Sequence, residues 1–205
     1  MAVLVGKPAP FFHDRHKRFA AVLGDGRLVE DFNFAKAAQG KYAVVFFYPL
    51  DFTFVCPSEI IAFNNRLAAF QERNVEVVSV SVDSHFTHAA WRNTPVAQGG
   101  IGPVGFTMVA DLTHEIARAY DVESEEGVAW RGSFLIDREG VVQHQVVNHF
   151  ALGRNVDEML RMVDALQFHE AHGEVCPAGW HAGGQGMQAD AAGVAAYLAE
   201  AADKL

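Results

Sequence analysis

The run YAVVFFY at residues 42–48 constrains the fold more than any other segment of the chain. It is continuously apolar and rich in β-branched and aromatic residues, and it lacks the alternation of a strand that has one face in water. Such a strand is buried on both faces of a sheet. The run VEVVSVSV at residues 75–82 is rich in valine and predicts another buried strand. We therefore expect an α/β fold built around a central sheet.

The rest of the chain supplies helices and hairpins around these two strands. Apolar residues at Ile60, Phe63, Leu67 and Phe70 recur at helical spacing and predict one helix. Asp111 is placed to cap another helix that runs to about Tyr120. Further elements are expected as strands at residues 19–23, 27–29, 106–110, 133–137 and 141–147 and as a helix at residues 85–93. Since strands and helices alternate early and a hairpin follows late, the sheet should be mixed.

The length of 205 residues suits one domain of ordinary size with an extension. Beyond residue 169 the chain is rich in glycine and holds few core-forming residues except Val175 and Trp180. An alanine-rich terminal helix is expected within residues 189–205. We therefore predict a domain at residues 1–168 and a C-terminal arm at residues 169–205.

The charge balance limits the partners. There are 16 basic and 25 acidic residues, so the net charge is -9. This excess of acidic residues argues against binding to nucleic acid or anionic membranes, since no basic patch is available to neutralise phosphates. The N-terminus lacks the features of a secretion signal, and the longest apolar run is too short to span a bilayer. We expect a cytoplasmic protein.

The chain has two cysteines, Cys56 and Cys176. Cys56 is expected where the loop after residues 42–48 enters a helix, with Pro57 in the first helical turn. A thiol there faces unpaired backbone N–H groups and the positive end of the helix, which favour the thiolate. Alternatively, Cys56 is a small hydrophobe that fills core space. Pro49 and Thr53 stand seven and three positions before it, where a hydroxyl can reach a thiolate and a proline can wall off a pocket.

These residues resemble a known family. FYPLDFTFVCPSEI, around Cys56, is similar to the peroxidatic-cysteine motif of the peroxiredoxins. GEVCPAGW, around Cys176, resembles the resolving-cysteine segment of their typical two-cysteine class, which includes alkyl hydroperoxide reductase C components. Intervening segments such as RGSFLIDREGVVQHQVVN match in order over almost the whole chain. The resemblance implies a thioredoxin-like fold, which agrees with the predicted order of strands and helices.

The resemblance also implies roles for individual residues. Cys56 would attack the peroxide and become a sulfenic acid. Thr53 and Pro49 match the hydroxyl and the shielding proline of the motif. Arg131 matches the arginine that points at the thiolate and the peroxide, and Glu59 would orient that arginine. Cys176 would resolve the sulfenic acid as a disulfide across a subunit boundary.

The implied protein is a thiol-specific peroxidase for hydrogen peroxide and organic hydroperoxides, without a cofactor or metal. Thioredoxin or a flavoprotein-type disulfide reductase would recycle it, and homodimers would assemble into a ring-shaped decamer.

Two alternative functions stay open. A thiol–disulfide oxidoreductase usually needs Cys-x-x-Cys, and position 59 is Glu. A ring-shaped holdase chaperone is compatible with the apolar content. His169, His172 and Cys176 are clustered in sequence, but we expect solvated histidines there rather than a metal site.

Overall fold

The structure is a computed structural model that describes residues 2–12 and 19–205. The chain forms two compact units, Met1–Val156 and Asp157–Leu205. Residues 13–18, which belong to the segment leading into the first hairpin, lie outside the described residues. The division of the sequence into a domain at residues 1–168 and an arm at 169–205 stays a prediction.

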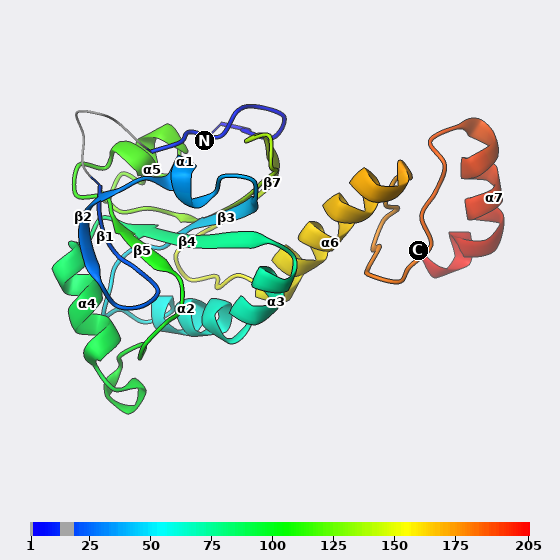
Figure 1. The fold of residues 1–205 in the computed structure, drawn as a ribbon. Coiled ribbons are helices and arrows are strands. Elements are labelled where there is room, and N and C mark those ends of the chain that lie inside the picture. The colour runs from blue at the N-terminus through cyan, green and yellow to red at the C-terminus, as the bar shows by residue number, and fades with distance from the viewer. Residues whose placement is uncertain (1, 13–18) are drawn as a thin grey trace. The chain divides into compact units, whose positions relative to one another are not determined.

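The first unit contains a seven-stranded sheet with the strand order β2-β1-β5-β4-β3-β6-β7 (Figure 1). The strands are β1 (Phe19–Val22), β2 (Leu28–Phe32), β3 (Tyr42–Phe47), β4 (Val75–Ser81), β5 (Thr107–Ala110), β6 (Arg131–Ile136) and β7 (Val142–Asn148). β3, β4 and β5 are parallel to one another, and the other neighbouring pairs are antiparallel. The predictions of an α/β fold and a mixed sheet are confirmed.

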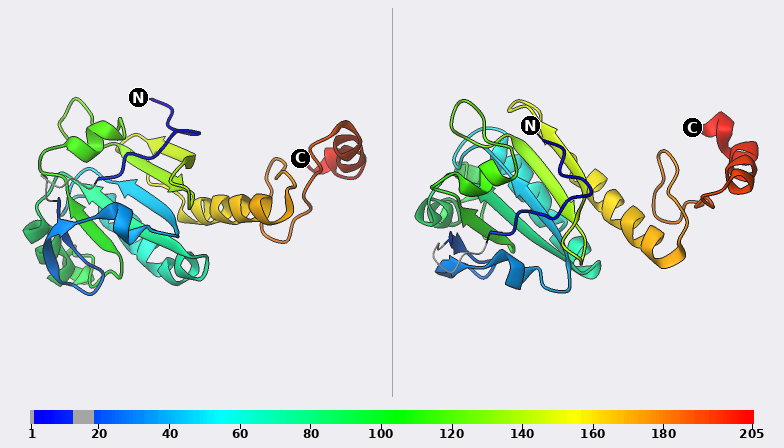
Figure 2. Two further views of the ribbon diagram at one scale, coloured as in Figure 1. Left: turned by 45° about the horizontal axis from the view of Figure 1, so that its top comes forward. Right: turned by 90° about the horizontal axis from the view of Figure 1, so that it is seen from above.

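Helices lie on both faces of this sheet (Figures 1 and 2). They are α1 (Phe34–Ala37), α2 (Cys56–Asn65), α3 (Leu67–Glu72), α4 (His85–Asn93) and α5 (Glu115–Ala119). All six residues of β3 are buried, and successive side chains point to opposite faces. Phe47 shares a core cluster with Phe34 of α1 and Ile116 of α5. Phe46, on the other face, stacks on Phe63 of α2 with ring centroids 3.9 Å apart. The unbroken apolar run of β3 follows from this two-sided burial.

The prediction of one continuous helix from Ile60 to Phe70 is wrong. α2 ends and α3 begins around Arg66, whose backbone (φ -110°, ψ 6°) departs from helical geometry. The rings of Phe63 and Phe70 still stack at 6.0 Å. The apolar spacing therefore predicted the buried face correctly, but it carried no information about the break.

The predicted start of the helix after β5 is also wrong. α5 begins at Glu115, and His114 at its N-cap has a left-handed backbone with φ 60°. The carboxylate of Asp111 nevertheless accepts the backbone N–H groups of Ile116 at 3.1 Å and Ala117 at 2.7 Å. Asp111 thus satisfies the free N–H groups of the first turn from outside the helix.

α6 (Val156–His172) begins at the last residue of the first unit and continues in the second unit, which also contains α7 (Ala191–Ala201). Between them, Trp180 is buried against Phe168 with ring centroids 4.9 Å apart, and its indole N–H donates to the carbonyl of Gly184. α7 confirms the predicted terminal helix. Its N-cap is Asp190, which accepts the backbone N–H of Gly193 at 2.7 Å.

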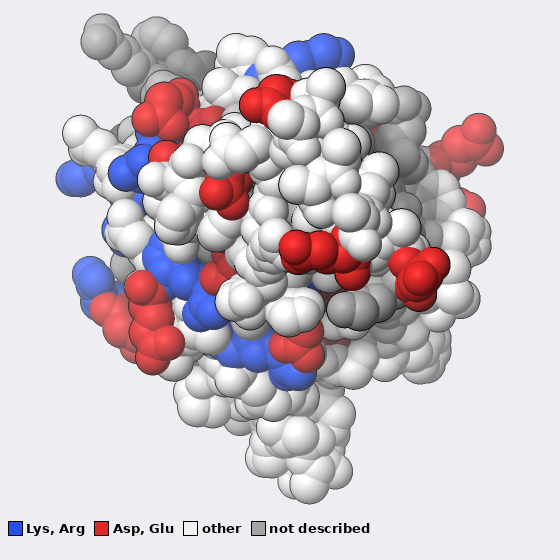
Figure 3. Space-filling model, turned by 90° about the vertical axis from the view of Figure 1, so that its right-hand side faces the viewer, with Lys and Arg blue, Asp and Glu red and all other residues white. Residues whose placement is uncertain are grey.

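The surface shows both signs of charge. Acidic and basic side chains are interspersed among uncharged ones on the face drawn in Figure 3. Over the described ranges, none of the helices combines the length and the apolar character that crossing a membrane requires.

Candidate active site

Cys56 is the first residue of α2 and follows the loop that leaves β3. Its residue exposure is 1%, and Pro57 lies in the first helical turn. The predicted placement of Cys56 at a helix start is therefore confirmed. Val55 at the N-cap provides no side-chain cap, but its carbonyl accepts the backbone N–H groups of Ser58 at 3.1 Å and Glu59 at 3.3 Å. These N–H groups are therefore paired, and the positive end of the helix dipole is what remains near the thiol.

The hydroxyl of Thr53 contacts the Cys56 sulfur. Oγ1 lies 3.0 Å from Sγ and 2.7 Å from the backbone carbonyl oxygen of Leu50. A hydroxyl has one proton to donate, so these two acceptors compete for it. While Cys56 is a thiol, its S–H can donate to Oγ1 and the Thr53 proton can stay on Leu50. When Cys56 is a thiolate, the Thr53 proton can turn to the sulfur.

A guanidinium approaches the same sulfur from β6. Nη1 of Arg131 lies 3.4 Å from Sγ of Cys56 and 2.7 Å from Oε2 of Glu59. Nε of Arg131 donates to the backbone carbonyl of Phe150 at 2.7 Å. The Arg131 side chain is only 4% exposed, so its positive charge acts on the sulfur with little screening by water. These bonds on two sides fix the direction in which the guanidinium points.

Glu59 lies one helical turn after Cys56 and is paired with two arginines. Besides Arg131, it binds Arg154, whose Nε and backbone N–H donate to Oε1 and whose Nη2 donates to Oε2, each at 2.8 Å. Burial by itself would raise the pKa of Glu59, but the hydrogen bonds and charge of Arg154, together with the charge of Arg131, outweigh it and hold the pKa below its ordinary value. Glu59 is thus a buried carboxylate that keeps its charge.

Arg154 is a site residue that the sequence interpretation missed. Its Nη1 also donates to the carbonyl of Gly132 and to the hydroxyl of Ser133, and its side chain is 3% exposed. Arg154 therefore ties α2 to the start of β6, where Arg131 lies. The sequence held only an indirect signal for Arg154. A glutamate that is buried beside one arginine and has two oxygens to satisfy can be expected to bind a second cation.

For the remaining predicted residues, Pro49 and Cys176, the structure shows where each lies in its own unit. Pro49 is buried two residues after the end of β3, in the same loop as Thr53. Cys176 belongs to the second unit, where it is partly exposed and its thiol donates to the carbonyl of Ala165 at 3.4 Å. Burial raises the pKa of Cys176, and the charge of Arg161 offsets only part of this rise. The structure thus brings together Cys56, Thr53, Glu59 and Arg131 in the first unit, and both cysteines are free thiols.

The histidines near Cys176 contact backbone rather than one another. Nδ1 of His169 lies 2.7 Å from the carbonyl of Glu174, and Nδ1 of His172 lies 3.0 Å from the carbonyl of Phe168. In residues 2–12 and 19–205, no three His, Cys, Asp or Glu side chains converge as metal ligands would.

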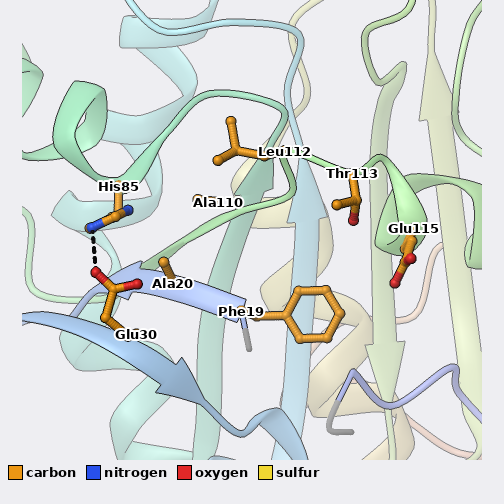
Figure 4. Close-up of a pocket in the computed structure, with 8 residues that line it drawn as sticks. All are labelled: Phe19, Ala20, Glu30, His85, Ala110, Leu112, Thr113 and Glu115. Atoms are coloured by element: carbon orange, nitrogen blue, oxygen red, sulfur yellow. Dashed lines mark ion pairs between the residues drawn. The ribbon is translucent and has the colours of Figure 1, made fainter. Parts of the chain in front are cut away.

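A pocket of about 350 Å³ lies elsewhere on the first unit (Figure 4). His85 and Glu30 pair with each other in its lining, with Nε2 and Oε1 3.2 Å apart. Phe19, Ala20, Ala110, Leu112, Thr113 and Glu115 complete its lining. None of the side chains that contact Cys56 lines this pocket, so it is separate from the thiol site.

The contacts of Cys56 define what the site can do. A sulfur with a hydroxyl on one side and a guanidinium on the other is equipped to act as a thiolate nucleophile. The same two donors can hold an oxygen atom next to the sulfur and stabilise negative charge that develops on it.

Comparison with known proteins gives a consistent result. Residues 5–145 match the AhpC/TSA family, and residues 165–200 match the C-terminal domain of 1-Cys peroxiredoxin. Alkyl hydroperoxide reductase C of Helicobacter pylori is 54% identical over 203 residues, which cover 99% of this chain and 100% of that protein.

Solved structures show the same similarity. The reduced 2-Cys peroxiredoxin of Plasmodium vivax has a TM-score of 0.90 and 49% identity, covering 97% of this chain and 100% of that one. Plasmodium yoelii Prx1a, which forms an artifactual octamer when modified at its N-terminus, has a TM-score of 0.74 and 53% identity, covering 85% of this chain and 97% of that one.

Proposed function

Because the chain belongs to the AhpC/TSA family of thiol-dependent peroxidases, we propose that Cys56 is the thiol that attacks the peroxide. The observation that carries this assignment is the convergence of two donors on one buried sulfur. The Thr53 hydroxyl lies 3.0 Å from Sγ and the Arg131 guanidinium lies 3.4 Å from it.

The reaction is a displacement at oxygen. The Cys56 thiolate forms a bond to the terminal oxygen of the hydroperoxide, and the O–O bond breaks. The departing oxygen leaves with the electron pair and takes a proton, which gives water from hydrogen peroxide or an alcohol from an organic hydroperoxide. Cys56 is oxidised to a sulfenic acid, and the peroxide is reduced.

The donors matter more than the acidity of the thiol. A thiolate becomes a weaker nucleophile as its parent thiol becomes more acidic, so acidity alone yields little net rate. Arg131 and Thr53 are placed to hold the peroxide in line with the sulfur and to stabilise charge on the breaking O–O bond. Glu59 and Arg154 contribute by fixing the Arg131 guanidinium, and Pro49 by shielding the pocket.

Cys176 is the resolving thiol in this proposal. It attacks the sulfenic sulfur of Cys56 on another subunit, which forms a disulfide and releases water. Support comes from its location in a separate unit and from its partial exposure. Its pKa is raised by burial, which favours the thiol form in this conformation. A disulfide requires Cα atoms within about 7 Å. Because Cys56 is buried, we expect the first turn of α2 and residues 174–180 to unfold locally.

The oligomer and the reductant are proposed by analogy with the family. We propose a homodimer with two equivalent sites, each formed by Cys56 of one subunit and Cys176 of the other. We propose that five such dimers assemble into a ring-shaped decamer. Thioredoxin or a flavoprotein-type disulfide reductase would reduce the disulfide in the cytoplasm.

Non-reducing electrophoresis tests the subunit arrangement. One equivalent of peroxide should convert the wild-type protein into a covalent dimer, and Cys176→Ser should abolish that dimer. Oxidised protein that runs only as a monomer, with no free thiol left, would show an intrachain bond instead.

Peroxide consumption separates an enzyme from a chaperone. With a suitable reductant, Cys56→Ser should consume no peroxide, whereas a holdase activity should survive this substitution. Retained peroxide turnover in Cys56→Ser would contradict the assignment of Cys56.

A further inference from the structure

A second buried polar cluster supports the loop that carries Thr53. Asp51 is 6% exposed, and its carboxylate accepts the hydroxyl of Tyr48 at Oδ1 with a distance of 2.7 Å. Oδ2 lies 2.7 Å from Nδ1 of His88 in α4. The backbone N–H of Asp51 donates to Oδ2 of Asp83 at 2.9 Å. Three residues, Tyr48, Asp83 and His88, therefore contact Asp51.

His88 is the partner that ties this cluster to the helix. It is fully buried, and its second ring nitrogen, Nε2, lies 3.3 Å from the backbone carbonyl of Val109. Both ring nitrogens thus face acceptors, and Tyr48 Oη lies 3.4 Å from Nδ1. The carboxylates of Asp51 and Asp83 lie close together beside the imidazole. Burial and then the negative charge of Asp51 therefore raise the pKa of Asp83. An apolar side chain in place of His88 would leave a buried carboxylate without one of its partners.

The loop needs such an anchor because its backbone is strained. Phe52, the residue after Asp51, has a left-handed backbone with φ 54°. For a residue other than glycine this conformation is sterically unfavourable. It persists where surrounding bonds fix the backbone on either side. On one side Asp51 makes three hydrogen bonds, and on the other the Thr53 hydroxyl contacts the Leu50 carbonyl and the Cys56 sulfur.

We propose that the buried Asp51–His88 pair is a positioning device that holds the strained turn at Phe52 and thereby places the Thr53 hydroxyl against Cys56. The inference rests on the proposed peroxidase function, and it adds two residues that touch neither the sulfur nor the substrate. Without the pair, the turn relaxes, the hydroxyl leaves the sulfur, and the peroxide loses one of its two donors. The loss is specific for peroxide because attack on a simple alkylating agent does not require an oxygen to be held in line.

The test compares two reactions of the same sulfur. In a Cys176→Ser background, Cys56 is the one remaining cysteine, so its rate constants with hydrogen peroxide and with iodoacetamide can be measured separately. The informative quantity is the ratio of the two rate constants, because a general loss of fold changes alkylation as well. Circular dichroism and thermal melting establish which variants are folded.

Three substitutions vary the pair, and one serves as a control. His88→Leu removes the donor, Asp51→Asn removes the charge with little change in shape, and His88→Gln keeps an N–H that can reach Asp51. His85→Gln is the matched control, because His85 lies on the same helix but pairs with Glu30 in the lining of the separate pocket (Figure 4).

We expect the ratio to fall at least tenfold in His88→Leu and Asp51→Asn, to fall less in His88→Gln, and to stay unchanged in His85→Gln. If His88→Leu does not fold, Asp51→Asn and His88→Gln carry the test. An unchanged ratio in folded His88→Leu or folded Asp51→Asn would overturn the inference, and an equal fall of both rate constants counts as an unchanged ratio. If the parent itself shows no fast oxidation of Cys56, the proposed function fails instead.

Discussion

The substitution Glu59→Gln tests the part of the site that depends most on electrostatics. Glu59 is 2% exposed at its side chain, and its two oxygens accept hydrogen bonds from Arg131 and Arg154. Glutamine keeps one oxygen, which can still accept the Nε and backbone N–H of Arg154. Its amide NH₂ would instead face Nη1 of Arg131 and Nη2 of Arg154, where donor meets donor.

The size of the effect follows from these contacts. Two charge-assisted hydrogen bonds are lost at about 1.5–3 kcal/mol each. Removing one partner of a buried ion pair costs about 3–5 kcal/mol. We therefore expect the free energy of unfolding to fall by about 3–5 kcal/mol at neutral pH. Because Arg131 also loses its anchor, the rate of Cys56 oxidation should fall at least tenfold, which corresponds to about 1.4 kcal/mol.

The pH dependence identifies the cause. The pKa of Glu59 is lowered in the folded protein from its ordinary value of 4.5. Its contribution to stability is therefore fully present above pH 4.5 and is lost as the pH falls through the folded pKa. Since glutamine does not titrate, the difference in unfolding free energy between the two proteins should shrink in that range.

The assay is urea unfolding at fixed protein concentration, at neutral pH and at several acidic pH values. Glu76→Gln serves as the control, because Glu76 pairs with Lys41 nearer the surface, where such a pair contributes about 0–1 kcal/mol. A Glu59→Gln protein as stable as the control, or a difference that does not change with pH, would refute the electrostatic reasoning.

Substitutions at three further positions have specific expected outcomes. Arg131→Met should lower the rate constant of peroxide attack on Cys56, measured by stopped flow, at least tenfold; an unchanged rate would remove Arg131 from the mechanism. Thr53→Val should lower the same rate constant about tenfold, or about 1.4 kcal/mol, and Thr53→Ser should retain most of it; equal rates for the two variants would argue against the hydroxyl. Phe52→Gly should unfold with a free energy about 1 kcal/mol higher than that of Phe52→Ala, because glycine adopts φ 54° without the steric cost. A more stable alanine variant in urea unfolding would contradict this strain.

The sequence predicted those features that depend on local chemistry. The two-sided apolar run of β3 required a central strand, and Pro57 after Cys56 required a helix start; both are confirmed. The break at Arg66 could not be predicted, because the apolar spacing continues across it. The shift of the α5 start to Glu115 depends on the left-handed backbone of His114, which no neighbouring residue type demands.

The residues of the site fall into the same two groups: those with a local sequence signal and those without one. Thr53 lies three positions before Cys56, so a local pattern suggested it, whereas Arg131 and Glu59 were identified through the resemblance to a family. Arg154 lies far along the chain from Glu59 in an irregular segment, and its role depends on a tertiary contact that sequence spacing does not encode. The same holds for His88, whose partner Asp51 is on another element.

The central claim is that Cys56 is the sulfur atom that peroxide oxidises. It is tested most directly by intact-protein and peptide mass spectrometry of Cys176→Ser after one equivalent of hydrogen peroxide. We expect a gain of one oxygen, about 16 Da, located on the peptide that contains Cys56, and its removal by a dithiol. Recovery of that peptide unmodified while the peroxide is consumed would contradict the claim.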